Sequence, residues 1–402
     1  MQLKEILLKC GTVITGDGRK LNDVSILIKG ESIEQIGSNL SIGSDAEILD
    51  YSDRVIMPGI IDTHIHIVHD ETNPDPAEMR DLPDEYLSIR ATTYTKKILD
   101  YGVTTVADAG ARGEVSLAVK KAIDMGYAIG PRFLACGRMI TITGGRDTTY
   151  GPLEADGPDG VRKATRGEIA RGVDFIKLAA TGAITSTKTE SMSPQFTIEE
   201  MSAAAEEAHK VGKKAHAHAY GDIGISNTIL SGVDVVVHGH PMSSTCIELM
   251  KKYNTLYMPT FVTYYESIQH HDEGLLPEYM VRKEKELFPL MEAGLRNAVK
   301  AGIEIVVGSD SGCPYTPFGV STMEELDLLV RYGGMTEMDA LVAGTLNAAR
   351  SLNIDSYVGT LKPGLSADML VLKEGLNPLE DISILQDPTN LESIFLKGKR
   401  VK

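Results

Sequence analysis

Eight short β-rich apolar runs alternate with helical patterns through the middle of the chain, and this alternation constrains the fold more than any other feature of the sequence. Alternation of this kind is typical of βα units around a parallel sheet. One intervening helix is marked at both ends, by Thr197 and Glu200 as a capping box and by Gly212 just past its last turn. The predicted strands are 60–67, 103–107, 132–135, 173–179, 213–220, 233–238, 256–262 and 303–310, and the predicted helices include 197–211 and 289–301.

Eight units over roughly 300 residues fit a (β/α)8 TIM barrel better than a doubly wound sheet, and no GxGxxG turn follows the first strand. The two ends of the chain carry further strand patterns, which we expect to pair with each other. We therefore predict an α/β protein with a small β-sandwich domain from residues 1–57 plus 357–402, and a barrel from residues 58–356.

Three long connections follow predicted strands and lack helical periodicity. Loops of that length inside a compact domain are commonly lids or binding loops. At the carboxyl ends of barrel strands they would lie on the face where such enzymes keep their chemistry. The three connections are 141–160, 181–195 and 264–279.

Composition narrows the class of protein. Of the 402 residues, 42% are apolar and 24% are charged, which excludes intrinsic disorder. Forty basic against 56 acidic side chains leave a net charge of −16, which disfavours a nucleic-acid partner. No apolar stretch is long enough for a membrane span, and the four scattered cysteines suggest no disulfide framework. We expect a cytoplasmic protein whose chains assemble into a homo-oligomer.

Polar side chains at strand positions identify a candidate metal site. His64 and His66 lie two residues apart on the first strand, so both face the same way and can chelate one ion. Lys177 interrupts the apolar fourth strand, where an isolated ammonium is costly to bury. It needs either a carboxylate partner or carbamylation by CO2, which would convert it into an anionic oxygen ligand able to bridge two metals.

The later strands add further candidates near their carboxyl ends. His218 lies near the end of the fifth strand and is a better ligand candidate than the deeper His216, which we favour as a core histidine. His238 follows the apolar sixth strand, and Asp310 closes the eighth, where a helix N-cap role is the structural alternative. Imidazole and carboxylate ligands without thiolate suit zinc or a similar divalent ion. Two metal sites would be filled by His64, His66, Lys177, His218, His238 and Asp310.

The sequence resembles the amidohydrolase superfamily over nearly its whole length. PGIIDTHIH, the lysine of FIKLAATG, AHAHAYG, VVHGH and GSDSG match its motifs in order, and PGLSADMLVL with NPLEDI resembles the tail of its small β-domain. Within the superfamily, the chain is most similar to metal-dependent prolidases and to Xaa-Arg/Lys carboxypeptidase-like dipeptidases. These are in turn similar to imidazolonepropionases and ochratoxin-type amidases.

The resemblance implies a role for each candidate residue. His64, His66 and Asp310 would hold the more buried of two divalent metal ions, most simply zinc. His218 and His238 would hold the more exposed one, and the Lys177 carbamate would bridge both. Two cations would activate a water molecule, whose proton Asp310 would take and deliver to the leaving amine.

Three further residues are candidates for contacts with the substrate. His240 could hydrogen-bond the oxyanion or be a surface histidine. Tyr220 and Arg146 could hold a substrate carboxylate, although Arg146 stands where relatives often carry a histidine and could instead be a solvated loop charge.

The expected reaction is hydrolysis of the C–N bond of dipeptides or N-acyl amino acids. The alternatives are a cyclic-amide hydrolase of the imidazolonepropionase kind and an ochratoxin-type amidase. Deamination is disfavoured because Lys177 is present and no glutamate follows His218 closely. A non-catalytic scaffold is disfavoured because every expected ligand position is occupied.

Overall fold

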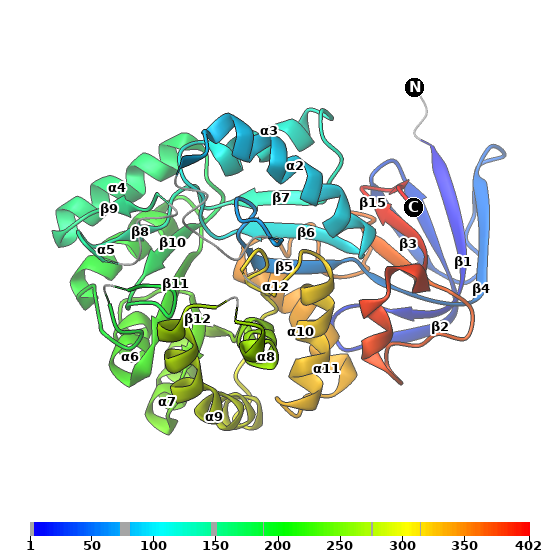
Figure 1. Ribbon diagram of the computed structural model, residues 1–402. Helices are drawn as coiled ribbons and strands as arrows, with labels where there is room; N and C mark the ends of the chain where they lie inside the picture. The colour runs from blue at the N-terminus through cyan, green and yellow to red at the C-terminus, as the bar shows by residue number, and fades with distance from the viewer. Residues whose placement is uncertain (1–3, 73–80, 146–150, 188, 275, 314) are drawn as a thin grey trace.

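The computed structural model of the protein combines a terminal β-sheet with a larger body of parallel strands and helices (Figure 1). It describes residues 4–72, 81–145, 151–187, 189–274, 276–313 and 315–402. In Figure 1, the terminal sheet lies on one side of the molecule, close to both ends of the chain. No helix among these residues has the length and apolar character needed to cross a membrane.

The terminal sheet draws its strands from both ends of the chain. Its seven strands run in the order β16-β15-β14-β4-β1-β2-β3, and β14 pairs with β4 in the antiparallel direction. The expected pairing of the two termini is therefore confirmed, whereas the domain boundaries at 57/58 and 356/357 stay a prediction. The strands are β1 Glu5–Ile14, β2 Lys20–Lys29, β3 Ser32–Gly37, β4 Glu47–Pro58, β14 Met369–Leu372, β15 Leu391–Leu396 and β16 Lys399–Arg400.

The larger body is a mixed α/β structure with two parallel sheets. One sheet has the order β5-β6-β7 and the other β13-β12-β11-β10-β8-β9. Nearly all residues of these strands are buried, which explains why they read as short apolar runs rather than alternating ones. The strands are β5 Ile60–Ile65, β6 Val103–Asp108, β7 Arg132–Ala135, β8 Ile140–Thr141, β9 Leu153–Glu154, β10 Ile176–Ala179, β11 Ala215–Tyr220, β12 Val235–His240 and β13 Leu256–Met258.

Backbone hydrogen bonds join both edge strands of the three-stranded sheet, β7 and β5, to neighbouring segments of the chain. The Asp174 N–H donates to the Ala135 carbonyl at the end of β7 (2.8 Å). The Val306 N–H donates to the carbonyl of Tyr257 in β13, and the Asp310 N–H donates to the carbonyl of His64 in β5. Both donor–acceptor distances are 2.8 Å. Segment 303–311 thus joins the last parallel strand to the first.

Two predicted strands differ from the structure. Segment 303–310 is not a continuous strand and forms only isolated bridges. The Val307 N–H donates to the Ala343 carbonyl instead of to a neighbouring strand, and the backbone of Asp310 has a left-handed conformation (φ 55°). The strand predicted at 256–262 ends at Met258. Pro259 follows, and Thr260 takes a left-handed conformation (φ 47°) from which a helix begins.

The helices follow the strands as expected, with two corrections. The 264–279 segment is not a helix-free loop, because α8 occupies much of it, and the helix predicted at 289–301 begins at Glu278 with Pro289 inside it. The capping box of Thr197 and Glu200 is present. The helices are α2 Asp84–Asp100, α3 Val115–Asp124, α4 Gly157–Arg171, α5 Ile198–Lys210, α6 Gly221–Leu230, α7 Ser244–Tyr253, α8 Phe261–Gln269, α9 Glu278–Lys300, α10 Val320–Arg331, α11 Glu337–Val342 and α12 Ala348–Ser351, with short turns η2 His271–Glu273, η3 Ala343–Asn347, η4 Ile382–Gln386 and η5 Pro388–Asn390.

Candidate metal centre and substrate cavity

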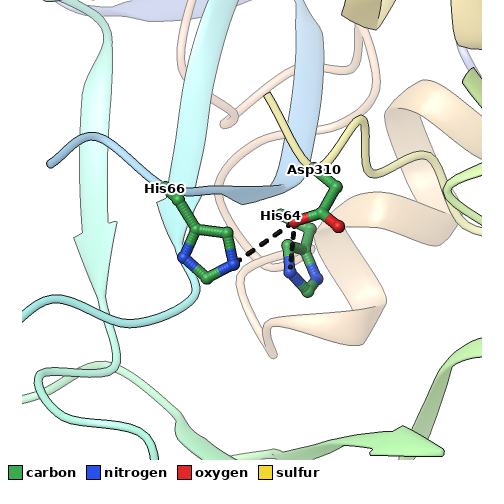
Figure 2. Close-up of side chains that lie close together, drawn as sticks. All are labelled: His64, His66 and Asp310. Carbon is green, nitrogen blue, oxygen red and sulfur yellow. Dashed lines mark ion pairs between the residues drawn. The ribbon is translucent and has the colours of Figure 1, made fainter. Parts of the chain in front are cut away.

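His64, His66 and Asp310 converge at the carboxyl end of β5 (Figure 2). The Nε2 atoms of both histidines lie 3.2 Å from Oδ1 of Asp310, and all three side chains are buried. Candidate ligand atoms of the three residues lie within 4.8 Å of one another. Figure 2 shows both imidazole rings directed toward the same carboxylate. Two imidazoles and a carboxylate in this arrangement suit a divalent ion.

The side-chain carboxylate of Asp62 fixes the two chain segments that carry this group. The buried carboxylate of Asp62 accepts the N–H groups of His64 (3.0 Å) and Ser309 (3.1 Å) and the hydroxyls of Ser309 (2.5 Å) and Thr322 (2.6 Å). Burial raises the pKa of Asp62, whereas these hydrogen bonds oppose the rise. Sequence reasoning overlooked Asp62, although an acid inside an apolar strand is the same signal that identified Lys177.

His218 and His238 form a second group on the neighbouring strands β11 and β12. Their ring centroids lie 4.5 Å apart, and the ring of His238 lies 5.8 Å from that of His64. The His218 Nε2–H donates to the Gly182 carbonyl (2.8 Å), so the lone pair of this imidazole is on Nδ1.

The tautomer of His238 follows from its neighbour Thr260. The Thr260 hydroxyl donates to the Pro259 carbonyl (2.7 Å), which leaves its oxygen to accept from the Nδ1–H of His238 (2.8 Å). The Tyr264 hydroxyl lies 3.1 Å from the same nitrogen. The lone pair is then on Nε2, which is buried and has no hydrogen-bond partner among the described residues. Burial and the nearby His218 hold the pKa of His238 well below its usual range, so the ring is neutral. A buried, neutral imidazole with an open nitrogen fits a metal ion.

Lys177 lies within reach of the first group. It is buried on β10, and its Nζ lies 3.3 Å from Nδ1 of His64. Its strand pairs directly with β11, the strand that carries His218. Lys177 therefore lies beside the first group of histidines, on the strand next to the one that carries His218.

The remaining sequence candidates have different outcomes. His216 is a core histidine, buried beside Phe175 with its Nε2 2.8 Å from the Ser351 carbonyl. His240 is fully buried, so the surface alternative is wrong. Its nitrogens contact the Pro259 carbonyl (3.1 Å) and the Tyr257 hydroxyl (3.2 Å), which gives its proposed role at an oxyanion no support. Arg146 lies outside the described residues.

A cavity adjoins the two groups of histidines. His218, His238 and Asp310 line it together with Tyr220, whose hydroxyl contacts that of Tyr264. The remaining wall is mostly apolar, with one buried acid. It is formed by Ala183, Ile184, Thr185, Thr263, Tyr264, Ser267, Leu276, Met280, Glu284 and Cys313.

The tyrosine and the acid on α8 and α9 were not predicted from the sequence. Tyr264 is buried, and its hydroxyl lies 3.1 Å from Nδ1 of His238. Glu284 accepts from the Ser267 hydroxyl (2.6 Å) and from His271 Nε2 (3.1 Å). Tyr264 was missed because segment 264–279 was interpreted as a loop, and the helical spacing of 263, 264 and 267 was the signal that could have identified it. Glu284 was missed because it lies between that segment and the helix predicted at 289–301.

Comparisons with known proteins agree with this chemistry. The amidohydrolase family model matches residues 55–401. Ochratoxinase from Aspergillus niger is 29% identical over 442 residues, covering 100% of this chain and 87% of the relative. Imidazolonepropionase from Picrophilus torridus is 23% identical and covers 91% of each chain. A crystal structure of a Xaa-Pro dipeptidase with bound methionine has a TM-score of 0.90 and 29% identity, covering 99% of this chain and 100% of that one.

Proposed function

This chain belongs to the amidohydrolase family and is a hydrolase acting on C–N bonds, and from that premise we propose that it cleaves dipeptides or N-acyl amino acids at a two-metal centre. The observation that carries the proposal is the pair of neighbouring histidine groups, of which His218 and His238 line the cavity with Asp310, while Lys177 lies beside His64. The closed succession of parallel strands supports the further proposal that this body is the expected (β/α)8 barrel.

The proposed metal ligands are divided between the two groups. His64, His66 and Asp310 would hold one ion, His218 and His238 the other, and a carbamate on Lys177 would bridge them. When bound, the ions, most simply zinc, would activate water and polarise the scissile carbonyl. The open Nε2 of His238 supports the second site, because a buried nitrogen without a partner is otherwise costly.

The chain's own groups would move the proton and hold the substrate. Asp310 lines the cavity and is close to both His64 and His66, so its carboxylate is placed to take the proton of the attacking water. The same carboxyl group would then deliver that proton to the leaving amine nitrogen. Tyr220 would donate its hydroxyl to the substrate, with Tyr264 holding that hydroxyl in place.

The position of Glu284 in the cavity lining supports lysine or arginine as the side chain of the preferred substrate. Glu284 lines the cavity, and the hydrogen bonds from Ser267 and His271 both reach the same oxygen of its carboxylate, Oε2. Burial raises the pKa of Glu284, and the hydrogen bonds from Ser267 and His271 oppose the rise. A cationic side chain that crossed the apolar wall would pair with this carboxylate.

Glu284→Gln is therefore expected to change specificity rather than abolish activity. We expect the wild-type enzyme to prefer a Xaa-Lys substrate over its neutral isostere Xaa-norleucine by about 10-fold in kcat/KM, and the variant to lose that preference, because about 1.4 kcal/mol of charge pairing is tenfold in rate. Steady-state kinetics on the two substrates measure the ratio. The control variant Glu278→Gln, at the exposed start of the same helix, should keep the wild-type preference for Xaa-Lys. An unchanged ratio in Glu284→Gln would refute this role.

The ochratoxin-type amidase is the second candidate function. The apolar wall formed by Ile184, Leu276 and Met280 suits a bulky apolar group, and the similarity to ochratoxinase extends over the whole chain. The cyclic-amide alternative stays a prediction.

Amino-acid release from a substrate panel tests the proposal. Zinc- and bicarbonate-treated protein is offered Xaa-Pro, Xaa-Lys, Xaa-Arg and N-acyl amino acid substrates, an ochratoxin-type amide and an imidazolone ring. Release of an amino acid from the linear amides supports the proposal and identifies the preferred side chain. Activity on the imidazolone alone would favour the cyclic alternative, and silence across the panel would contradict the proposed substrate class.

A further inference from the structure

Lys283 on α9 is a buried cation that donates to backbone carbonyls of another segment. Its Nζ reaches the carbonyl oxygens of Ala183 (3.2 Å), Ser186 (2.8 Å) and Thr189 (2.7 Å), and its side chain is only 3% exposed. The nearest carboxylate oxygen recorded for it, on Glu190, is 4.0 Å away. A lysine ammonium has three N–H donors, and here they meet three acceptors. Such charge-assisted bonds are stronger than neutral ones, particularly where water is excluded.

The neighbouring residues of α9 bind the same segment. The Tyr279 hydroxyl donates to the Thr185 carbonyl (3.1 Å), and Arg282 pairs with Glu190 at 3.2 Å. Tyr279, Arg282 and Lys283 are three and four residues apart, so they share one side of the helix. This side of α9 is therefore attached to the connection that follows β10.

The attached segment and α9 both contribute to the lining of the cavity. Ala183, Ile184 and Thr185 contribute one part of its lining, while Met280 and Glu284 contribute another from α9. The preceding residue, Gly182, accepts the Nε2–H of His218 through its carbonyl. The contacts of Lys283 therefore join two parts of the cavity lining, immediately beside a proposed metal ligand.

We propose that Lys283 is a positioning residue that fixes the 183–185 wall against α9 and thereby sets the width of the substrate cavity. The inference rests on the proposed function, because cavity width matters to catalysis only if the substrate occupies this cavity. Lys283 itself is not among the residues that line the cavity, so it acts through the backbone that it holds.

Lys283→Met tests the proposal, because methionine is of similar length and offers no donors. With two buried carbonyls and one partly buried carbonyl unpaired, we expect KM for the best panel substrate to rise about 10-fold while kcat changes less than about threefold, the pattern of lost binding rather than lost chemistry. The variant should also discriminate less between substrates with small and with large side chains. Lys285→Met, an exposed neighbour on the same helix, is the matched control and should leave both parameters unchanged.

Limited proteolysis provides a readout that does not depend on activity. Cleavage within 183–190 should be at least about 10-fold faster in Lys283→Met than in Lys285→Met, since the loosened segment opens locally more often. This difference would support Lys283 as the fixing residue even if the wild-type protein hydrolysed no panel substrate, an outcome that would count against the proposed function alone. Equal cleavage rates in the two variants would overturn the inference.

Tyr279→Phe covers the case in which Lys283→Met does not fold. It removes one hydrogen bond to the same segment, so we expect a change in the same direction of about threefold in KM and in cleavage rate. Circular dichroism and zinc content, measured first, establish that the variant is folded and loaded. A folded Tyr279→Phe protein with the wild-type KM and cleavage rate would also contradict the proposal.

Discussion

Asp310→Asn is expected to lower kcat by about 10³-fold or more, because general acid–base groups contribute on the order of 10² to 10⁴ and this carboxylate would also be a metal ligand. Asparagine keeps the shape of the side chain but cannot accept the proton of water. Burial raises the pKa of Asp310, yet His64 and His66 outweigh it and hold the pKa well below its usual range. The carboxylate is therefore charged at neutral pH, and the substitution removes that charge.

The control for this variant is Asp234→Asn. Asp234 stands just before β12, at the opposite end of the strands from the cavity, where it pairs with Lys214 (2.8 Å). We expect its kcat to stay within about threefold of wild type, since its charge would not face the reacting atoms. Steady-state kinetics on the best panel substrate compare the two variants. If Asp310→Asn kept a tenth of the wild-type kcat or more, the assigned role would be wrong.

Lys177→Met is expected to remove at least one of the two metal ions and to lower kcat by about 10³-fold, because no anionic oxygen would then bridge the two groups of histidines. Methionine cannot form a carbamate, and it offers no anionic oxygen that could bridge two ions. Elemental analysis after treatment with zinc and bicarbonate measures the ions bound per chain.

Lys214→Met is the matched control for Lys177→Met. Lys214 immediately precedes β11, far along the strand direction from His218, and pairs with Asp234. We expect this variant to bind two ions per chain and keep its activity. Two ions bound by Lys177→Met, with activity near that of wild type, would show that the lysine does not bridge them.

Much of the site could be predicted from the sequence because polar residues inside apolar strands are conspicuous. The spacing of His64 and His66 placed both on one face of a strand, and both rings point to one carboxylate in the structure. Lys177 stood out because an ammonium in a buried strand requires a compensating group, and it lies beside His64.

The part of the cavity lining that α8 contributes could not be predicted in the same way. The residues of α8 begin Phe261-Val262-Thr263-Tyr264, which have high β propensity, so local preference favoured a strand there. The helix instead begins after Thr260, and the buried carboxylate of Glu325 accepts the N–H groups of Phe261 (3.0 Å) and Val262 (2.7 Å). A contact across 60 residues of sequence leaves no local pattern, so tertiary structure overrode propensity.

His240 illustrates the limit of motif reasoning. Its position two residues after a proposed ligand suggested a place near the substrate, as strand alternation would give. In the structure its two nitrogens contact the Pro259 carbonyl and the Tyr257 hydroxyl instead. The left-handed conformation of His238 (φ 67°) breaks the regular alternation between them, and nothing in the local sequence announces it.

Anomalous diffraction at the zinc absorption edge, from crystals grown with zinc and bicarbonate, tests the central claim most directly. We expect two peaks. One zinc ion should be bound by His64, His66 and Asp310, and the other by His218 and His238. Electron density should continue from Nζ of Lys177 to both ions. A single peak at the first group, with an unmodified lysine and no metal at His238, would contradict the two-metal centre.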